Sequence, residues 1–420
     1  MRTIRAGAAS QIRMAMAALV LLVSALTGAC FGGEDVSEGP TVGALTSPAG
    51  PASGESYLAW DGAKLWMTWT EAREAVHHVL IAHHDGASWS EPTSLAVGTD
   101  FFVNWADFPA LLVKGDTLVS HWLQRGGQGT YDYGVRLSWS TDGGDTWSEP
   151  WTPHEDDTPT EHGFVSYFDG PQGISAVWLD GRNMVAGEGH GGPGAMTVRT
   201  RVLPIGRMAG PEVVLDAMTC ECCQTDATVA GGVPVVAYRD RSEAEVRNIH
   251  IARYQDGQWT EGRPVHDDGW VIGGCPVNGP ALASEGPRVG VAWFTAPDEE
   301  AQVRVAFSED RGTTFGDPVR VDEGSPSGRV DLLSLGEAGM LVTWLERRDG
   351  GAAVLSRIVA PKGELGKVMT LAATSEGRAS GFPRIARYGS DRLAVAWTDP
   401  DGEGQVHVAD YALSDWEGRP

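Results

Sequence analysis

Positive charge is scarce in this chain, which has 32 lysine and arginine residues against 56 aspartate and glutamate residues. The formal net charge of -24 argues against nucleic acid and anionic membrane surfaces as partners, because both attract clusters of basic side chains. Helical patterning is also scarce, since no segment of useful length carries apolar residues at helical spacing. The 55 glycines and 16 tryptophans instead fit a protein of tight turns and strands that end on aromatic residues.

Long apolar runs are absent except near the N-terminus, where residues 14–26 form one stretch after Arg2, Arg5 and Arg13. This stretch is too short to span a bilayer and is typical of an export signal. Small residues lead from it to Cys30, an order that resembles a bacterial lipoprotein signal, in which Cys30 becomes the lipidated first residue. An ordinary signal peptide that is cut nearby is the alternative.

The N-terminal pattern divides the chain into three segments. We expect residues 1–29 to be the signal, residues 30–54 to be a Gly-, Pro- and Ser-rich tether, and residues 55–420 to be the folded domain. Lipidation of Cys30 would make the membrane a partner through that anchor only. The expected location is the bacterial cell envelope, on a periplasmic or surface-facing side.

The folded domain is an internal repeat. Short apolar strands end on an aromatic residue roughly every 50 to 60 residues, which is typical of a β-propeller. These strand ends are Trp69, Trp122, Trp178, Tyr238, Trp293, Trp344 and Trp397. We therefore predict an all-β fold of four-stranded antiparallel blades, with seven blades favoured and a six-bladed ring as the alternative.

The last repeat lacks an outer strand. Residues 41–46, which lie within the predicted tether, have the pattern of a strand and precede the first repeat. Pairing this segment with the last repeat would close the ring and remove the exposed edges of its end blades. The sequence therefore predicts that the two ends of the domain meet.

Two turns carry nearly the same pattern, STDGGDTW at 140–147 and SEDRGTTF at 308–315. They resemble the Asp-box, or BNR repeat, of the sialidase (neuraminidase) superfamily. In this motif the aspartate accepts backbone N–H groups, the glycine adopts a left-handed conformation and the aromatic residue packs between blades. We interpret both segments as structural, and none of their residues is a catalytic candidate.

The body of the chain, about residues 55–410, resembles exported bacterial sialidase-like propellers, on segments such as PHEDDTPTEHGFVS, WLDGR, CECCQT, YRDRSE, CPVNGP and SGFPR. The resemblance implies an exo-alpha-sialidase type of glycosidase, with an arginine triad, a Tyr–Glu nucleophile pair and an aspartate acid/base. Arg182, Arg241 and Arg384 are the residues that could imitate the triad. Tyr238 is a conceivable nucleophile, although its place at a strand end favours packing. The first repeat lacks the Arg-Ile-Pro motif of sialidases.

Topology predicts where a site can form. In an up-and-down blade, the turn after the second strand and the connection to the next blade lie on the same face. Charged residues, histidines and cysteines are concentrated in these segments, so we expect them to surround one mouth of the central channel.

Four of the five cysteines flank the fourth repeat: Cys220, Cys222, Cys223 and Cys275. Two disulfides are one interpretation, because the count is even and the envelope is oxidising. A second is a thiolate site for a soft metal ion, copper or zinc, with His154, His162 or His266 as further ligands, and free redox thiols are the third. The cofactor is therefore either absent or a soft metal at this cluster.

The same mouth should hold candidates for acid–base chemistry and for binding an anion. The candidate catalytic residues are Asp180, Asp240, Glu161 and His162. The candidate ligand-binding residues are Arg182, Arg239, Arg241, Arg384, Asn278 and His154, because converging guanidinium groups bind carboxylates or sulfates well. Loop ion pairs between Asp180 and Arg182 and between Asp240 and Arg241 are the structural alternative.

Three functions compete at this point. The first is a monomeric envelope protein that binds or hydrolyses an acidic glycan, or binds another small anion, at the mouth. The second is a metal-thiolate or redox-handling protein that uses the four cysteines. The third is a protein-interaction scaffold, to which exposed Trp105 and Trp270 would contribute.

Overall fold

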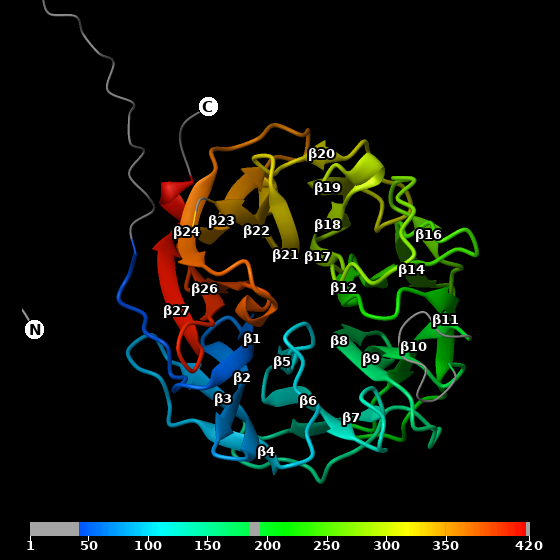
Figure 1. Ribbon diagram of the computed structural model, residues 1–420, viewed down its shortest axis with the longest axis vertical. Helices are drawn as coiled ribbons and strands as arrows, with labels where there is room; N and C mark the ends of the chain where they lie inside the picture. Colours follow the sequence, from blue (N-terminus) through cyan, green and yellow to red (C-terminus); the bar gives the residue numbers. More distant parts are fainter. Residues whose placement is uncertain (1–41, 185–193, 349, 417–420) are drawn as a thin grey trace, which may run out of the picture. The chain divides into compact units, whose positions relative to one another are not determined.

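The computed structural model describes residues 42–184, 194–348 and 350–416. Seven antiparallel sheets follow one another along the chain, and each forms one blade of the ring in Figure 1. The seven-bladed β-propeller is thus confirmed, and the six-bladed alternative is wrong. The predicted signal, Cys30 and the first part of the tether lie outside the described residues.

The first four blades occupy the chain up to residue 264. Blade 1 contains β1 (Ser53–Trp60), β2 (Leu65–Arg73), β3 (Val76–His84) and β4 (Thr93–Gly98). Blade 2 contains β5 (Leu111–Lys114), β6 (Thr117–Arg125) and β7 (Tyr133–Ser140). Blade 3 contains β8 (His162–Gly170), β9 (Gly173–Asp180), β10 (Met196–Val202) and β11 (Val213–Thr219). Blade 4 contains β12 (Asp226–Ala230), β13 (Val233–Arg239), β14 (Ile249–Gln255), β15 (Gln258–Trp259) and β16 (Arg263–Pro264).

The last three blades also carry four short 3-10 helices. Blade 5 contains β17 (Ala281–Glu285), β18 (Arg288–Thr295), η1 (Pro297–Glu299), β19 (Gln302–Ser308) and β20 (Val319–Arg320). Blade 6 contains β21 (Pro326–Ser334), η2 (Gly336–Ala338), β22 (Met340–Arg348), β23 (Gly351–Val359) and β24 (Met369–Thr374). Blade 7 contains η3 (Arg378–Ser380), β25 (Arg384–Tyr388), β26 (Arg392–Asp399), β27 (Gln405–Ala412) and η4 (Leu413–Asp415).

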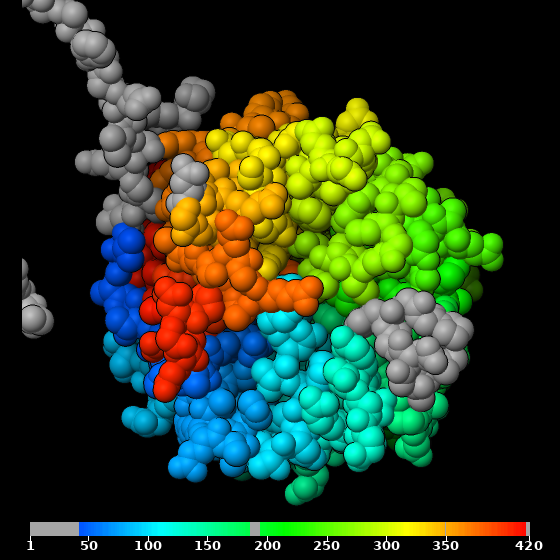
Figure 2. Space-filling view, in the orientation of Figure 1, coloured from blue at the N-terminus to red at the C-terminus, as the bar shows by residue number. Residues whose placement is uncertain are grey.

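The segment before blade 1 lies beside the last strand of blade 7. Val42 forms an antiparallel bridge with Tyr411, and Pro51 forms one with Gln405. The backbone N–H of Leu45 also donates to Asp410 Oδ1 at 2.8 Å. Figure 2 shows the two ends of the described chain, blue and red, against each other. This contact covers the outer edge of β27, which would otherwise be open.

Each of the seven repeated aromatic residues lies on the second strand of its blade. Trp69, Trp178, Trp344 and Tyr238 have no exposed surface, and Trp293 is only 1% exposed. Aromatic side chains of this size bury a large apolar area, so they fill the wedge between one blade and the next. Packing between blades therefore explains the period that the sequence shows.

The indole N–H groups of three of these tryptophans share a hydrogen-bonding pattern that our sequence analysis missed. In three blades the indole N–H donates to a carboxylate two residues later, and an arginine two residues further on pairs with the same carboxylate. The three sets are Trp69–Glu71–Arg73, Trp178–Asp180–Arg182 and Trp344–Glu346–Arg348. A buried N–H without an acceptor is costly, so the carboxylate is part of the scaffold.

Carboxylates near the axis join inner strands of consecutive blades. Asp107 accepts the backbone N–H of Phe164 at 2.6 Å, and Asp226 accepts that of Leu282 at 2.7 Å. In blades 6 and 7, Asp331 Oδ2 accepts the N–H of Ile385 at 2.7 Å. These bonds satisfy inner-strand donors that face the neighbouring blade.

The two turns with the shared pattern have the predicted internal hydrogen bonds. Asp142 Oδ1 accepts the N–H of Thr146 at 2.9 Å, and Asp310 Oδ1 accepts that of Thr314 at 2.9 Å. The glycine two residues after each aspartate has a positive φ, 94° and 76°. Both turns are therefore structural, while their descent from the Asp-box stays a prediction.

No helix in the described parts of the chain is long and apolar enough to cross a membrane.

The indole–carboxylate pairs predict a specific stability loss. Trp344→Phe keeps the ring but removes the donor to Glu346, which lies 2.6 Å away. We expect the free energy of unfolding in urea to fall by about 1 to 3 kcal/mol. Trp397→Phe is the matched control, because Trp397 is partly exposed and its indole N–H has no hydrogen bond among the described residues. Equal losses in the two variants would show that the hydrogen bond contributes nothing.

Candidate functional site

The predicted site residues lie at one end of the strands. Asp180 pairs with His162 on one side and with Thr197 on the other, and Thr219 forms a bridge with Asp240. The N–H of Cys220 donates to the carbonyl of Arg239 at 3.0 Å. The strand ends of blades 3 and 4 and the cysteine connection therefore share one face, as the topology predicts.

The four cysteines meet beside blade 4. Cys222 and Cys275 form a disulfide, whereas Cys220 and Cys223 are free and buried. The Sγ atoms of Cys220 and Cys223 are 2.8 Å apart. The Sγ atoms of Cys220, Cys222 and Cys275 all lie within 4.8 Å of one another. The structure thus brings the whole cluster together but forms only one of the two expected disulfides.

Charged side chains surround the cysteines. Arg247 Nη1 lies 3.4 Å from Cys220 Sγ and 2.9 Å from Glu221, while Arg241 pairs with Glu221 and Glu245. Burial raises the pKa of the Cys220 thiol well above its ordinary value. Burial opposes ionisation of Cys223 as well, but the hydrogen bond from Cys220 and the charge of Arg239 bring its pKa below the ordinary value. Cys223 is therefore the favoured thiolate of the pair.

Asp180 and Arg182 are engaged with each other and with the scaffold. Asp180 is fully buried and accepts from Trp178 Nε1 at 2.8 Å and from Arg182 Nε at 2.7 Å. Arg182 Nη2 also lies 3.0 Å from Asp156 and 2.9 Å from Glu212. Burial opposes ionisation of Asp180, but the hydrogen bonds from Arg182 and Trp178 hold its pKa below the ordinary value. Both side chains are therefore engaged within the protein, and their roles in catalysis and ligand binding stay predictions.

The two candidate histidines stack on each other in the loop before blade 3. The ring centroids of His154 and His162 are 4.1 Å apart, and Asp156 Oδ1 lies 3.2 Å from His162 Nε2. Burial and the nearby His162 lower the pKa of His154 to about 4. Their nitrogens and Asp156 form a compact group with metal-ligand spacing, separate from the cysteines. They are therefore not ligands that complete a cysteine site.

Glu161 is buried beneath this loop. Tyr133 donates its hydroxyl to Glu161 Oε1. Burial raises the pKa of Glu161 to about 8, although the bond from Tyr133 opposes the shift and the charge of Asp107 adds to it. A carboxyl group with this pKa has the protonation behaviour of a general acid, but it is only 4% exposed and lines none of the cavities described below.

Arg239 and Asn278 hold backbone in place. The Arg239 guanidinium donates to three carbonyl oxygens, those of Asn278 at 2.9 Å, Arg247 at 2.8 Å and Phe294 at 2.6 Å. Asn278 Oδ1 accepts the N–H of Arg329 at 2.7 Å. Both side chains are at least nine-tenths buried, which leaves them little surface for a ligand, and their role in binding stays a prediction.

Arg384 lies in the central channel rather than at a shared rim. Its guanidinium packs over Tyr57 at 4.4 Å and over Phe108 at 4.8 Å, and its Nε lies 3.3 Å from Asp331. The cavity beside it has a volume of only about 20 Å³. Arg182, Arg241 and Arg384 each pair with carboxylates of the protein itself, and the triad that the family resemblance implies stays a prediction.

Asp240 belongs to a different polar group, between the outer strand of blade 3 and blade 4. Tyr238 donates its hydroxyl to Asp216 at 2.7 Å, and His250 Nε2 lies 3.6 Å from Asp240. Burial and the charge of Asp216 raise the pKa of Asp240 to about 7. Tyr238 is fully buried, and burial with the nearby Asp216 raises its pKa far above 10. Tyr238 therefore packs and is not a nucleophile, whereas Asp240 stays a proton-binding candidate.

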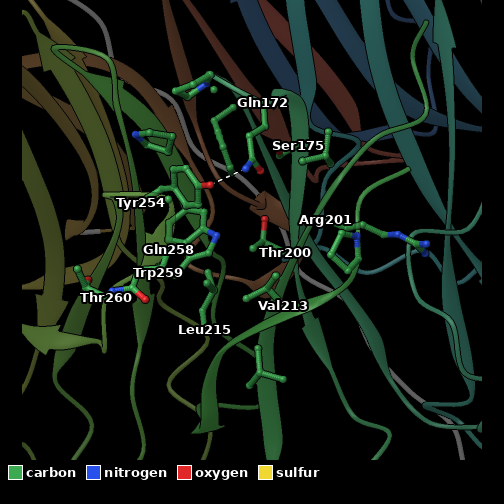
Figure 3. A pocket seen from close by; sticks show the side chains of 18 of the residues that line it. Gln172, Ser175, Thr200, Arg201, Val213, Leu215, Tyr254, Gln258, Trp259 and Thr260 are labelled. Carbon is green, nitrogen blue, oxygen red and sulfur yellow. Dashed lines mark hydrogen bonds between the residues drawn. The ribbon is translucent and has the colours of Figure 1, made fainter. Parts of the chain in front are cut away.

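One cavity is lined by residues that our sequence analysis did not select. It has a volume of about 530 Å³ and lies in the seam between blades 3 and 4. Figure 3 shows Tyr254 and Trp259 from blade 4 facing Gln172 and Thr200 from blade 3, with a hydrogen bond between Gln172 and Tyr254. Most of its wall is apolar, and amide and hydroxyl groups such as those of Gln172, Thr200 and Gln258 lie between the apolar residues. Part of its wall is the QDGQW segment at residues 255–259, which contributes Gly257, Gln258 and Trp259.

This cavity is near the opposite end of the strands from the cysteines. Gln172 belongs to the turn between β8 and β9, and Tyr254 precedes the turn between β14 and β15. Arg201 lines it, but its guanidinium is bound to Glu155 at 2.6 Å and to the carbonyl of Gly210 at 2.7 Å. The exposed Glu261 lies at the cavity wall. The charges at the cavity wall, a bound arginine and an exposed glutamate, therefore do not favour an anionic ligand.

The aromatics expected to form a docking face are largely covered. Trp270 is 7% exposed and stacks edge-on with Phe294, while the Arg239 guanidinium packs over its ring at 5.1 Å. Trp105 is half-buried against Phe382 and Arg329. Trp270 therefore contributes to the interior, and the scaffold hypothesis loses one of its two supports.

Neither the family models nor the curated proteins that were compared contain a match to this sequence. Solved structures with a similar architecture include the BP39L lectin from Burkholderia pseudomallei, with a TM-score of 0.63 and 13% identity over 87% of this chain and 97% of that chain. An ulvan lyase bound to an oligosaccharide has a TM-score of 0.55 and 11% identity over 89% and 94% of the two chains. An α-L-arabinanase from Penicillium chrysogenum complexed with arabinobiose has a TM-score of 0.51 and 12% identity over 90% and 100%. At these identities the likeness establishes the fold alone.

The buried Glu161 predicts a dependence of stability on pH. Its ordinary pKa is 4.5 and its folded pKa is about 8, so between these values the folded state holds a proton that the unfolded state has lost. The contribution of this proton to the free energy of unfolding is complete below pH 4.5. As the pH rises from there toward the folded pKa, the free energy of unfolding falls by about 1.4 kcal/mol per pH unit. When the free energy of unfolding is measured with urea at several pH values, Glu161→Gln should lack this pH dependence. Glu149→Gln, an exposed control, should keep it. Parallel pH profiles for all three proteins would contradict the assignment.

Proposed function

We propose that this protein is a glycan-binding propeller whose saccharide site is the cavity between blades 3 and 4. The observation that carries the proposal is the cavity itself, whose volume of about 530 Å³ is in the range of small-molecule sites. Tyr254 and Trp259 offer ring faces on which a sugar can pack, and Gln172, Gln258 and Thr200 offer groups that bind hydroxyls. A lectin and an arabinanase complexed with a disaccharide are among the proteins of similar architecture, which supports a saccharide ligand.

The proposed ligand is a neutral saccharide, which departs from the acidic glycan that we expected at the channel mouth. The arginines of that mouth are held by protein carboxylates and carbonyls, and Arg201 in the cavity is bound in the same way. A carboxylate or sulfate entering the cavity would meet Glu261, while Arg201, the cation that lines the cavity, is already bound by Glu155 and the carbonyl of Gly210. A neutral sugar avoids this cost.

Binding, rather than hydrolysis, is the proposed activity. Glycosidases need two carboxyl groups that flank the scissile bond in an open site. Asp180 is fully buried, Glu161 is 4% exposed, and Asp240 lies beside Asp216 in a different part of blade 4. None of the three lines the cavity. Release of the fluorophore when the wild-type protein is incubated with a fluorogenic sialoside would overturn this part of the proposal.

The saccharide site can be tested by replacing its aromatic wall. Trp259→Ala should lower the affinity for neutral oligosaccharides, measured by calorimetry on hits from a glycan array, by about tenfold or more, because a stacking surface is lost. Trp89→Ala is the matched control, since Trp89 holds the equivalent place in the hairpin of blade 1 and lies outside the cavity. Unchanged affinity in Trp259→Ala, or preferential binding of sialylated glycans, would contradict the proposal.

We also propose that the protein is anchored in the bacterial envelope through a lipid on Cys30. The support is the order of basic, apolar and small residues before Cys30. In a bacterial host, Cys30→Ser should move the protein from the detergent-soluble membrane fraction to the aqueous fraction, because the lipid anchor is lost. The same distribution for both proteins on immunoblots of the two fractions would contradict the anchor.

A further inference from the structure

The cysteine cluster is unused by the proposed glycan site and combines a disulfide with two adjacent thiols. Cys220 Sγ is 2.8 Å from Cys223 Sγ, and the sulfurs of Cys220, Cys222 and Cys275 lie within 4.8 Å of one another. A thiol close to both sulfurs of a disulfide is the arrangement from which thiol–disulfide exchange begins. A purely structural disulfide needs no such neighbour.

We propose that these four cysteines form a thiol–disulfide exchange centre, in which the Cys220/Cys223 pair and the Cys222–Cys275 pair exchange two electrons. This activity goes beyond glycan binding and uses a different part of blade 4.

The charges around the cluster favour one thiolate. Three cations, Arg239, Arg241 and Arg247, face two carboxylates, Glu221 and Glu245. The ionised form of one cysteine balances the remaining positive charge, and a nearby arginine is the usual way to stabilise a thiolate. Arg247 Nη1 lies 3.4 Å from Cys220 Sγ, a free sulfur within 4.8 Å of both sulfurs of the disulfide. The surroundings therefore fit a nucleophile better than a divalent cation.

The exchange balances within the cluster. Cys220 passes its proton to the Cys223 thiolate along their hydrogen bond, and the Cys220 thiolate then attacks Cys222 Sγ. The Cys222–Cys275 bond breaks, and Cys275 leaves as a thiolate, which takes up the proton that Cys223 releases. Cys223 then attacks Cys220 Sγ, and Cys222 leaves as a thiolate. A disulfide and a dithiol have changed places, and no outside oxidant is consumed.

The two pairs differ in their access to solvent. Cys220, Cys222 and Cys223 are 0%, 4% and 1% exposed, whereas Cys275 is only partly buried and follows an exposed loop with Val271 at 64%. The exchange therefore moves reducing equivalents between a buried pair and a pair that reaches the surface through Cys275. The partner that this fits is a thiol or disulfide that approaches Cys275.

The test uses the full chain with Cys30→Ser, so that the cluster contains the only cysteines. The protein is equilibrated in buffers of reduced and oxidised glutathione, quenched with acid, alkylated and mapped by mass spectrometry without reduction. Among molecules with one disulfide and two thiols, we expect both Cys222–Cys275 and Cys220–Cys223, each in more than about a tenth of the population. This measurement needs no variant of the cluster, so misfolding of a variant cannot obscure it.

Two variants separate the steps. Cys223→Ser keeps the attacking thiol, so a Cys220–Cys222 bond with Cys275 free should become detectable. Cys220→Ser removes the attacking thiol, so only Cys222–Cys275 should remain. Circular dichroism checks that both variants keep the wild-type fold.

Three outcomes would overturn the proposal. One is a Cys222–Cys275 bond in every two-thiol molecule, with Cys220 and Cys223 unreactive until the protein unfolds. Another is a cluster with two disulfides in every glutathione buffer. The last is about one zinc or copper ion per chain by plasma mass spectrometry, with the thiols reacting only after removal of the metal by a chelator.

Discussion

The ring depends on one constraint, which is that large aromatics must be buried between blades without leaving their polar edges unpaired. Trp178 and Trp344 are fully buried, and each indole N–H donates to the carboxylate two residues later. An arginine then balances the charge of that carboxylate. The acidic and basic residues at these strand ends are therefore products of the packing, although the loop positions suggest a binding site.

This constraint changes where function can lie. The mouth of the channel is rich in charge, but its arginines and carboxylates mostly satisfy one another or the backbone. Space for a ligand instead exists at the seam between blades 3 and 4, where Pro171, Pro211 and Pro234 line a gap that no large side chain fills. Blade 4 also holds the cysteines near its other end, so the proposed saccharide site and the proposed exchange centre would share one blade.

The sequence predicted the architecture well because the repeat is carried by local patterns, a strand, a turn and an aromatic residue. It also predicted that the four cysteines meet, since topology alone brings Cys220 and Cys275 to one face. It did not predict the internal partners of Asp180, Arg239 and Arg384, because a charged residue in a loop looks the same whether its partner is a ligand or a buried indole, carbonyl or carboxylate. The seam cavity was missed because it depends on how two blades are spaced, which no single repeat encodes.

Contact between the first and last described segments has a consequence for the connectivity of the fold. Leu45 and Asp410 are hydrogen-bonded neighbours although 365 residues separate them along the chain. Because the termini of the ring lie side by side, a short peptide joining them and a new opening in an exposed turn elsewhere would keep every blade intact. The order of the seven blades in the ring is thus fixed by their neighbours, while the point at which the chain starts is interchangeable, so the domain should accept circular permutation.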